Sequence, residues 1–327
     1  MQPAVTKVGQ RVMLPPVFPK PRFRTTVGVE LEYLAIPKFR GNDPTLDPNA
    51  RTLVFFNGFM LRFSQWGFQM PRYTLQHGLN GFSDCNLIFF NNFGHGNSEI
   101  NGTGTRDYLR HCALAAHELV RSLGIHGRMF TVAHSMGSPI SLEFQRLTAD
   151  QVGGMAFVSP LFSDPMKVFP YAGLVEPRLE QIQALLKHDH VASIVTKALT
   201  ILAADIPLRI WHAVFTRKTG SKIRQDAFVK NLRKSLELDI SVFITALLSM
   251  IQTGDEIGSR FGHISVPRKI ILGERDFITD QKKTEQIIRE LAPDIPLVVL
   301  ENTTHWANSE RPRRVNKELR EFVDSVS

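Results

Sequence analysis

A serine flanked by small residues, at the junction of two different hydrophobic patterns, most constrains the fold of this chain. Residues 128–132 (RMFTV) form an apolar run of strand length, and residues 138–144 (SPISLEF) show helical spacing with a proline near the first turn. Between them, residues 133–137 read AHSMG. A strand that turns directly into a helix needs small side chains on either side of the turn, so that the two backbones can approach. The pattern therefore predicts a strained strand–turn–helix unit with Ser135 exposed at its apex.

A serine hydroxyl attacks a carbonyl efficiently only when a base removes its proton and a third group orients that base. Both groups occur downstream of this serine. Residues 267–276 form an apolar run that ends in a glycine turn and delivers Asp276, the candidate orienting acid. Residues 296–305 form a second apolar run followed by a polar loop, and that loop ends at His305, the candidate general base. Asp164, which follows an earlier apolar run, is the alternative acid.

Nucleophile, acid and base follow one another in the order found in the α/β-hydrolase superfamily, and three further segments support a resemblance to it. Residues 54–59 (VFFNGF) are similar to the family's oxyanion strand and turn, residues 92–99 (NFGHGNSE) to its Gly-His-Gly-x-Ser loop, and residues 310–312 (ERP) to the segment after its catalytic histidine. In this order, the segments resemble the cap-bearing serine esterase and lipase branch over most of residues 25–325.

The resemblance implies how the transition state would be stabilised. The backbone N–H groups of Phe59 and Met136 are expected to form the oxyanion hole. The serine would carry a covalent acyl group, which a water activated by the histidine then releases. The chain departs from the family at three positions: it has Asn57 where histidine is common, and Ser138 and Thr304 where glycine is common. None of these departures removes a reacting group.

Apolar runs of strand length alternate with helical patterns over most of the chain, which predicts an α/β fold with a doubly wound, mostly parallel sheet. Strand patterns disappear over residues 161–261, so we expect an inserted helical cap there. The remaining divisions are a basic N-terminal arm over residues 1–24 and the two parts of the hydrolase core over residues 25–160 and 262–327. The apolar segment 242–251 is shorter than the roughly 20 residues that span a bilayer, so it is interpreted as a buried cap helix.

These features together predict a serine hydrolase of the carboxylesterase and lipase type (EC 3.1.1) that needs no cofactor and no metal. The 23 phenylalanines, several of them beside the oxyanion segment, favour a small-molecule ester with an apolar or lipid-like acyl group. The same triad also serves thioesterases, hydrolases of carbon–carbon bonds and acyltransferases. A ligand receptor or signalling protein that retains its triad is the alternative from a different class.

The charge balance bears on partners and location. The chain has a formal net charge of +8, and seven lysines and arginines gather within residues 217–234. A solvated basic face is the simpler interpretation, and weak association with an anionic surface is the alternative. No nucleic-acid-binding motif accompanies the cluster, so no nucleic-acid partner is expected. With two cysteines and no pattern of a secretory signal, the sequence predicts a cytoplasmic location.

Overall fold

The computed structural model describes much of the predicted core and the end of the predicted cap. The described residues are 4–5, 11–12, 21–38, 45–78, 81–100, 107–148, 150–169 and 239–326, together with residues 209, 213 and 229. Most of the predicted arm (1–24), the greater part of the predicted cap (161–261) and the basic cluster at 217–234 lie outside the described residues. The domain boundaries therefore stay predictions.

Among the described residues, eight strands form one sheet in the order β10-β9-β8-β7-β5-β6-β4-β3. Neighbouring strands run parallel from β10 to β6, whereas β4 pairs antiparallel with β6, and β3 pairs antiparallel with β4. The predicted mostly parallel α/β sheet is therefore confirmed. The strands of this sheet are β3 (Arg22–Arg24), β4 (Glu30–Ile36), β5 (Thr52–Phe56), β6 (Asn86–Phe90), β7 (Met129–His134), β8 (Val152–Val158), β9 (Arg268–Gly273) and β10 (Leu297–Leu300). A separate antiparallel pair consists of β1 (Ala4–Val5) and β2 (Arg11–Val12).

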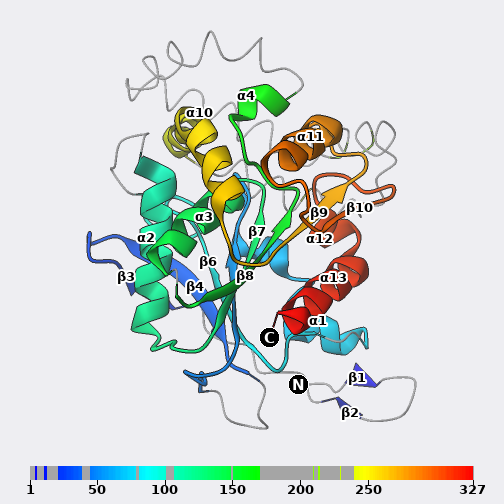
Figure 1. Ribbon diagram of the computed structural model, residues 1–327. Coiled ribbons are helices and arrows are strands. Elements are labelled where there is room, and N and C mark those ends of the chain that lie inside the picture. The colour runs from blue at the N-terminus through cyan, green and yellow to red at the C-terminus, as the bar shows by residue number, and fades with distance from the viewer. Residues whose placement is uncertain are drawn as a thin grey trace.

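Helices cover both faces of the sheet (Figure 1). Buried residues of α2, α3, α10 and α11 belong to one hydrophobic core, and those of the short helix η1, α12 and α13 belong to the core on the opposite face. The described helices are η1 (Phe63–Trp66), α1 (Pro71–Gln76), α2 (Tyr108–Ser122), α3 (Gly137–Leu147), α4 (Pro165–Val168), α10 (Ile240–His263), α11 (Gln281–Leu291), α12 (Ala307–Glu310) and α13 (Pro312–Ser325).

The central strands carry apolar side chains on both sides because helices bury each face of the sheet. Strand β5 shows the alternation: Val54 and Phe56 join the core that includes α2 and α3, while Leu53 and Phe55 join the core that includes α13. Phe55 also stacks on Phe89 of the neighbouring strand, with ring centroids 4.4 Å apart. Parallel strands bring their carboxyl ends to one edge of the sheet, and the loops at that edge carry the candidate site.

Helix α10 has the length and the mean hydropathy of a membrane-crossing helix. Its apolar side chains nevertheless pack into the core, since Val242, Met250 and Phe261 are almost completely buried. Phe162 stacks on Phe261, with ring centroids 3.8 Å apart. The segment 242–251 is therefore a buried helix, as predicted, whereas its membership of a cap stays a prediction.

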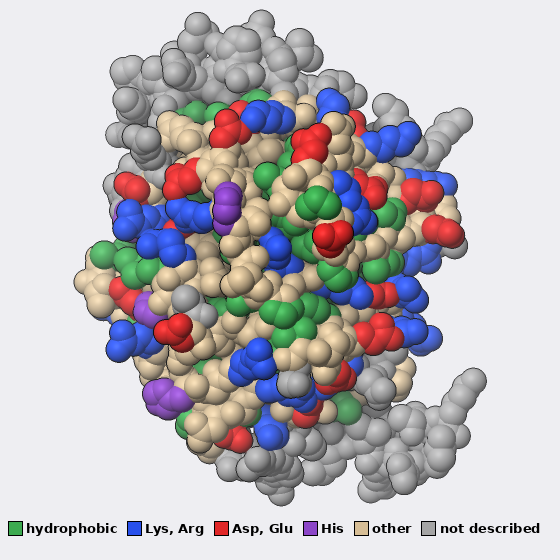
Figure 2. Space-filling view, in the orientation of Figure 1, with side chains coloured by type: hydrophobic (Ala, Val, Ile, Leu, Met, Phe, Trp, Pro, Cys, Tyr) green, Lys and Arg blue, Asp and Glu red, His purple; other side chains and the backbone are tan. Residues whose placement is uncertain are grey.

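On the face shown in Figure 2, lysine and arginine side chains are interspersed with aspartate and glutamate side chains. Ion pairs between such side chains join α13 to the loops that precede β5 and β6: Arg320 Nη1 lies 2.5 Å from Asp84 Oδ1, and Arg51 Nη1 lies 3.4 Å from Asp324 Oδ1. The described part of this face therefore mixes both signs of charge. The predictions of weak binding to an anionic surface and of no nucleic-acid partner stay predictions.

Candidate active site

The predicted strand–turn–helix unit is present, with Ser135 at its apex. Strand β7 ends at His134 and α3 begins at Gly137. Ser135 has a φ of +51°, a left-handed conformation that costs a non-glycine residue about 1 to 3 kcal/mol. Gly137 is required because a Cβ there would lie 2.5 Å from the carbonyl oxygen of Phe56. The turn is thus packed closely against the end of β5. Ser135 is only 8% exposed, so the serine at the apex is largely buried rather than exposed as predicted.

Asp276 and His305 form a buried pair, with His305 Nδ1 2.7 Å from Asp276 Oδ2. The amides of Ile278 and Thr279 donate to Asp276 Oδ1 at 2.9 and 3.0 Å, and the Thr279 hydroxyl donates to Oδ2 at 3.1 Å. Burial by itself raises the pKa of Asp276, but attraction to His305 and these hydrogen bonds outweigh burial and hold the pKa below its usual value. An ionised Asp276 accepts a hydrogen bond from Nδ1–H of His305, so Nδ1 keeps its proton and the lone pair is on Nε2, where a general base needs it.

The alternative acid, Asp164, makes a different contact. Its Oδ1 accepts a hydrogen bond from the amide of Met166 at 2.8 Å, which caps the short helix α4. The carboxylate that meets the His305 ring is that of Asp276. The geometry therefore favours Asp276 over Asp164 as the orienting acid.

The turn at Ser135 and the loop at His305 meet through His134. The ring centroids of His134 and His305 lie 4.8 Å apart, and His134 Nε2 lies 2.9 Å from the carbonyl oxygen of His305. Among the described residues, no hydrogen bond joins Ser135 Oγ to His305 Nε2. Such catalytic hydrogen bonds often form only when substrate is bound. The structure thus brings the two loops together and pairs two of the three side chains directly.

The two candidate oxyanion donors, Phe59 and Met136, follow neighbouring strands of the sheet. Strands β5 and β7 are parallel neighbours in which Phe56 pairs with Ala133. Phe59 and Met136 each follow three residues after that pair, so both amides lie just beyond the same edge of the sheet. Met136 is at the start of α3, where backbone N–H groups have no acceptor within the helix and carry the positive end of its dipole. The arrangement is compatible with an oxyanion hole between these two turns.

Asn57, one of the departures from the family pattern, holds the turn that precedes Phe59. Its Nδ2 donates to the carbonyl oxygen of Phe90 at 2.6 Å. Its Oδ1 accepts from Gln65 Nε2 and from Trp66 Nε1, each at 3.1 Å. Asn57 is fully buried. The sequence shows only a polar residue between an apolar strand and a glycine at this position, so this role was not predicted.

Glu32 organises the loop at residues 94–98, a role that was not predicted from the sequence. The side chain is buried, and its carboxylate accepts from Asn91 Nδ2 at 2.6 Å and from the backbone and side-chain amides of Asn97 at 3.0 and 3.1 Å. A Cβ at Gly96 would overlap Asn91 Nδ2, which explains the second glycine of the loop. A single glutamate in a strand pattern resembles a solvent-facing residue, so no local signal identified it.

The first turns of α10 cover both the oxyanion turn and this loop. Phe243 packs on Phe59 with ring centroids 4.8 Å apart. A Cβ at Gly94 would lie 2.5 Å from Val242 Cγ2, so the loop and the helix are in close contact. Phe59 and Phe243 are both half-buried. The start of α10 therefore forms an apolar wall beside the candidate oxyanion hole.

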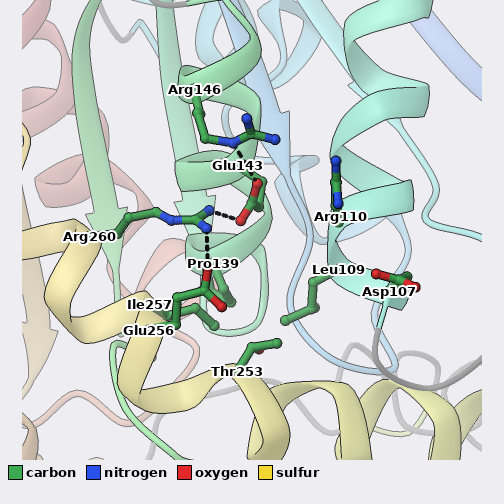
Figure 3. Close-up of a pocket in the computed structure, with 10 residues that line it drawn as sticks. All are labelled: Asp107, Leu109, Arg110, Pro139, Glu143, Arg146, Thr253, Glu256, Ile257 and Arg260. Carbon is green, nitrogen blue, oxygen red and sulfur yellow. Dashed lines mark hydrogen bonds and ion pairs between the residues drawn. The ribbon is translucent and has the colours of Figure 1, made fainter.

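A separate cavity of about 310 Å³ lies between α2, α3 and α10 (Figure 3). Four of its charged side chains pair with one another: Arg260 pairs with Glu143 and Glu256, and Arg146 Nε lies 3.2 Å from Glu143 Oε2. No candidate catalytic or oxyanion residue lines this cavity. Among the described residues, no group of three or more His, Cys, Asp and Glu side chains is placed to hold a metal ion.

Two fully buried histidines at this edge of the sheet are neutral. Burial lowers the pKa of His95 to about 4, and its Nδ1 lies 2.9 Å from the carbonyl oxygen of Phe93. Burial and repulsion from His305 lower the pKa of His134 to about 3. The Gly-His-Gly histidine is therefore a structural part of its loop.

From the lowered pKa values of these two histidines, we expect the free energy of unfolding to fall in acid. Their folded-state pKa values lie below the ordinary value of 6.5, so the unfolded chain binds protons that the folded chain does not. The free energy of unfolding is then highest above pH 6.5 and falls as the pH drops towards the folded-state values. Each histidine contributes a slope of up to about 1.4 kcal/mol per pH unit. Urea unfolding over this range measures the slope, and His95→Gln should reduce it; a constant free energy of unfolding would contradict the prediction.

The structure has the architecture of the α/β hydrolases. Its sheet is mostly parallel, a central strand turns through a strained serine into a helix, and an aspartate–histidine pair lies at the same edge. The chain is a member of that superfamily, as its sequence predicts. Residues 81–312 match the sequence model of the family described as serine aminopeptidase, S33, so the chain belongs to that family.

Proteins similar to this chain include a peptidase, an esterase and a lactonase. A proline iminopeptidase from Saccharolobus solfataricus is 21% identical over 242 residues, which are 74% of this chain and 76% of that protein. A thermophilic esterase from Thermogutta terrifontis superposes with a TM-score of 0.65 and 18% identity, covering 93% of this chain and 98% of that one. The enol-lactonase of Burkholderia xenovorans LB400 superposes with a TM-score of 0.64 and 16% identity, covering 93% and 100%. At these identities the two structures show a shared fold.

Proposed function

We propose that this protein is a serine hydrolase that cleaves a carboxylic ester with an apolar acyl group, using Ser135, Asp276 and His305. The observation that carries the proposal is the 2.7 Å contact between His305 Nδ1 and Asp276 Oδ2, at the same edge of the sheet as the strained turn at Ser135. Membership of a hydrolase family supports hydrolysis as the reaction class.

In the proposed reaction, Ser135 Oγ attacks the carbonyl carbon of the substrate while His305 Nε2 takes the hydroxyl proton. Asp276 stabilises the resulting imidazolium. The amides of Phe59 and Met136 receive the negative oxygen, and each is expected to lower the barrier by about 3 to 4 kcal/mol. The imidazolium then protonates the leaving alcohol, and a water activated by His305 releases the acid from the acyl-enzyme.

The wall beside the oxyanion turn supports an apolar acyl group. Residues 240–247 at the start of α10 include no charged residue, and Phe243 packs on Phe59 at this point. A substrate with a free amino terminus would bring an ammonium group, which is costly to bury unless an acidic or polar partner receives it. An ester with an apolar acyl group needs no such partner.

An aminopeptidase is the second candidate, because the proline iminopeptidase relative aligns with 74% of this chain. Three sets of substrates separate the candidates: p-nitrophenyl esters of short to long fatty acids, p-nitroanilides of proline and other amino acids, and acyl-CoA thioesters. The highest kcat/KM on a p-nitrophenyl ester supports the proposal, and the highest value on an amino-acid anilide or a thioester contradicts it. Activity on none of them, with a ligand that raises the melting temperature, would favour a receptor.

Replacing Phe243 with alanine is expected to lower kcat/KM for the preferred p-nitrophenyl ester by about 2- to 10-fold. The substitution removes apolar surface beside Phe59 that the proposed acyl group would contact, and loss of such contact costs about 0.8 kcal/mol per buried methylene. Phe243→Leu keeps an apolar wall and should lose less activity. Steady-state kinetics over a series of acyl lengths measures both variants. An unchanged kcat/KM for Phe243→Ala at every acyl length would show that this wall does not act on the substrate.

A further inference from the structure

His134 links three parts of the proposed site although it has no role in the proposed chemistry. It directly precedes Ser135 at the end of β7. Its Nε2 lies 2.9 Å from the carbonyl oxygen of His305, and the planes of the two rings are inclined by 60°. On its other side, a Cβ at Gly58 would overlap His134 Nδ1, so this ring also packs against the oxyanion turn.

The hydrogen bond defines which nitrogen of His134 carries the proton. A carbonyl oxygen only accepts, so His134 Nε2 must be the protonated donor to His305. Nδ1 is then unprotonated, and it has no hydrogen-bond partner among the described residues. Because burial lowers the pKa of His134 to about 3, the ring is neutral near pH 7. His134 therefore offers one fixed donor and takes no proton from the reaction.

This donor acts on the backbone of the residue that supplies the general base. The His305 side chain is held at its Nδ1 by Asp276, at 2.7 Å, and its peptide is held by His134. The preceding residue is fixed separately, because the Thr304 amide donates to Glu310 Oε2 at 3.1 Å. A ring held at one nitrogen can still swing if its backbone shifts, so an anchor on the backbone limits the position of Nε2. Since the anchor is the last residue of β7 and Ser135 follows it directly, the nucleophile and the base share one rigid support.

We propose that His134 is a positioning residue, which keeps the His305 imidazole within reach of Ser135 by donating a hydrogen bond to the His305 carbonyl oxygen. The inference rests on the proposed function of Ser135 and His305. It assigns the histidine of the turn a role in the alignment of the triad, beyond the filling of space beneath it.

Three substitutions of His134 separate the hydrogen bond from packing. In His134→Gln, the side-chain amide nitrogen can occupy nearly the position of Nε2 and donate the same bond. In His134→Asn, the amide reaches only as far as Nδ1, so the donor is kept but falls short of the carbonyl. His134→Met has similar length and no donor. If His134→Met fails to fold, the comparison of Gln with Asn still decides, since both bury an amide.

The test is to measure kcat and KM with the p-nitrophenyl ester on which the parent protein is most active, together with the melting temperature of each variant. His134→Gln should keep kcat within about threefold. His134→Asn and His134→Met should lose about 10- to 100-fold in kcat with little change in KM, because misplaced catalytic groups slow the chemical step without weakening binding. Equal kcat for the Gln and Asn variants at similar melting temperatures would overturn the inference.

Ser135→Ala, assayed in parallel, separates this inference from the proposed function. If Ser135→Ala is inactive and the Gln and Asn variants of His134 are equally active, only the role of His134 is wrong. If hydrolysis survives Ser135→Ala, the proposed function is wrong, and the inference about His134 is overturned with it.

Discussion

Loss of ester hydrolysis is the expected result of replacing Ser135 with alanine, with kcat falling by roughly 10⁵- to 10⁶-fold. The substitution removes the only atom that would form the acyl-enzyme. It leaves the backbone strain at φ +51° unchanged, because alanine and serine both carry a Cβ. The melting temperature should therefore match that of the parent protein. Labelling by a fluorophosphonate probe, read by intact mass, should disappear together with the turnover.

Ser138→Ala is the matched control for this experiment. Ser138 is the second residue of α3 and is fully buried, and its hydroxyl has no hydrogen-bond partner among the described residues. Its amide donates to the carbonyl oxygen of Ser135 at 2.9 Å, and the substitution leaves that backbone bond in place. Ser138→Ala should keep both hydrolysis and labelling. Hydrolysis by Ser135→Ala at the parent rate would refute the assignment of the nucleophile.

Asp276→Asn is expected to lower kcat by about 10⁴-fold while the protein stays folded. The amides of Ile278 and Thr279 can still donate to the side-chain oxygen of asparagine. The amide nitrogen of asparagine would then face His305 Nδ1 as a donor. His305 would have to accept at Nδ1 and carry its proton on Nε2, which is the wrong tautomer for a base. Steady-state kinetics on the preferred ester measures the loss.

Asp164→Asn is the control that tests the alternative acid. Asn caps a helix about as well as Asp, so the contact of residue 164 with the Met166 amide should survive. Activity should stay within about twofold of the parent value. Loss of activity in Asp164→Asn, with Asp276→Asn close to the parent rate, would reverse the assignment of the acid.

The turn at Ser135 could be predicted because its signal is local. Small residues at 133 and 137, a preceding apolar run and a following helical pattern all lie within a few positions of the serine. Asp276 and His305 could be found in the same way, since each follows an apolar run that forms a strand of the sheet. The parallel sheet then places the ends of these runs at one edge, as the alternation of patterns predicted.

Other parts of the site could not be predicted, because their signals are spread along the chain. Glu32 binds the amide of Asn97, 65 positions away, and in its own segment it is an ordinary strand glutamate. Asn57 bonds to Phe90, 33 positions away. The contact of Phe243 with Phe59 requires α10 to cross the oxyanion turn, and no pattern within α10 indicates where that helix lies.

The sequence by itself determined which chemical groups this protein has and the order in which they occur, because short-range sterics and hydrophobic periodicity specify strands, turns and helices locally. It left open whether Asp276 or Asp164 faces His305, and which groups His134 contacts. Only the tertiary structure decided these points. The partner of a buried polar group depends on which strands are neighbours and in what register, and His134 meets the carbonyl of His305 across 171 positions only because the folded sheet brings them together.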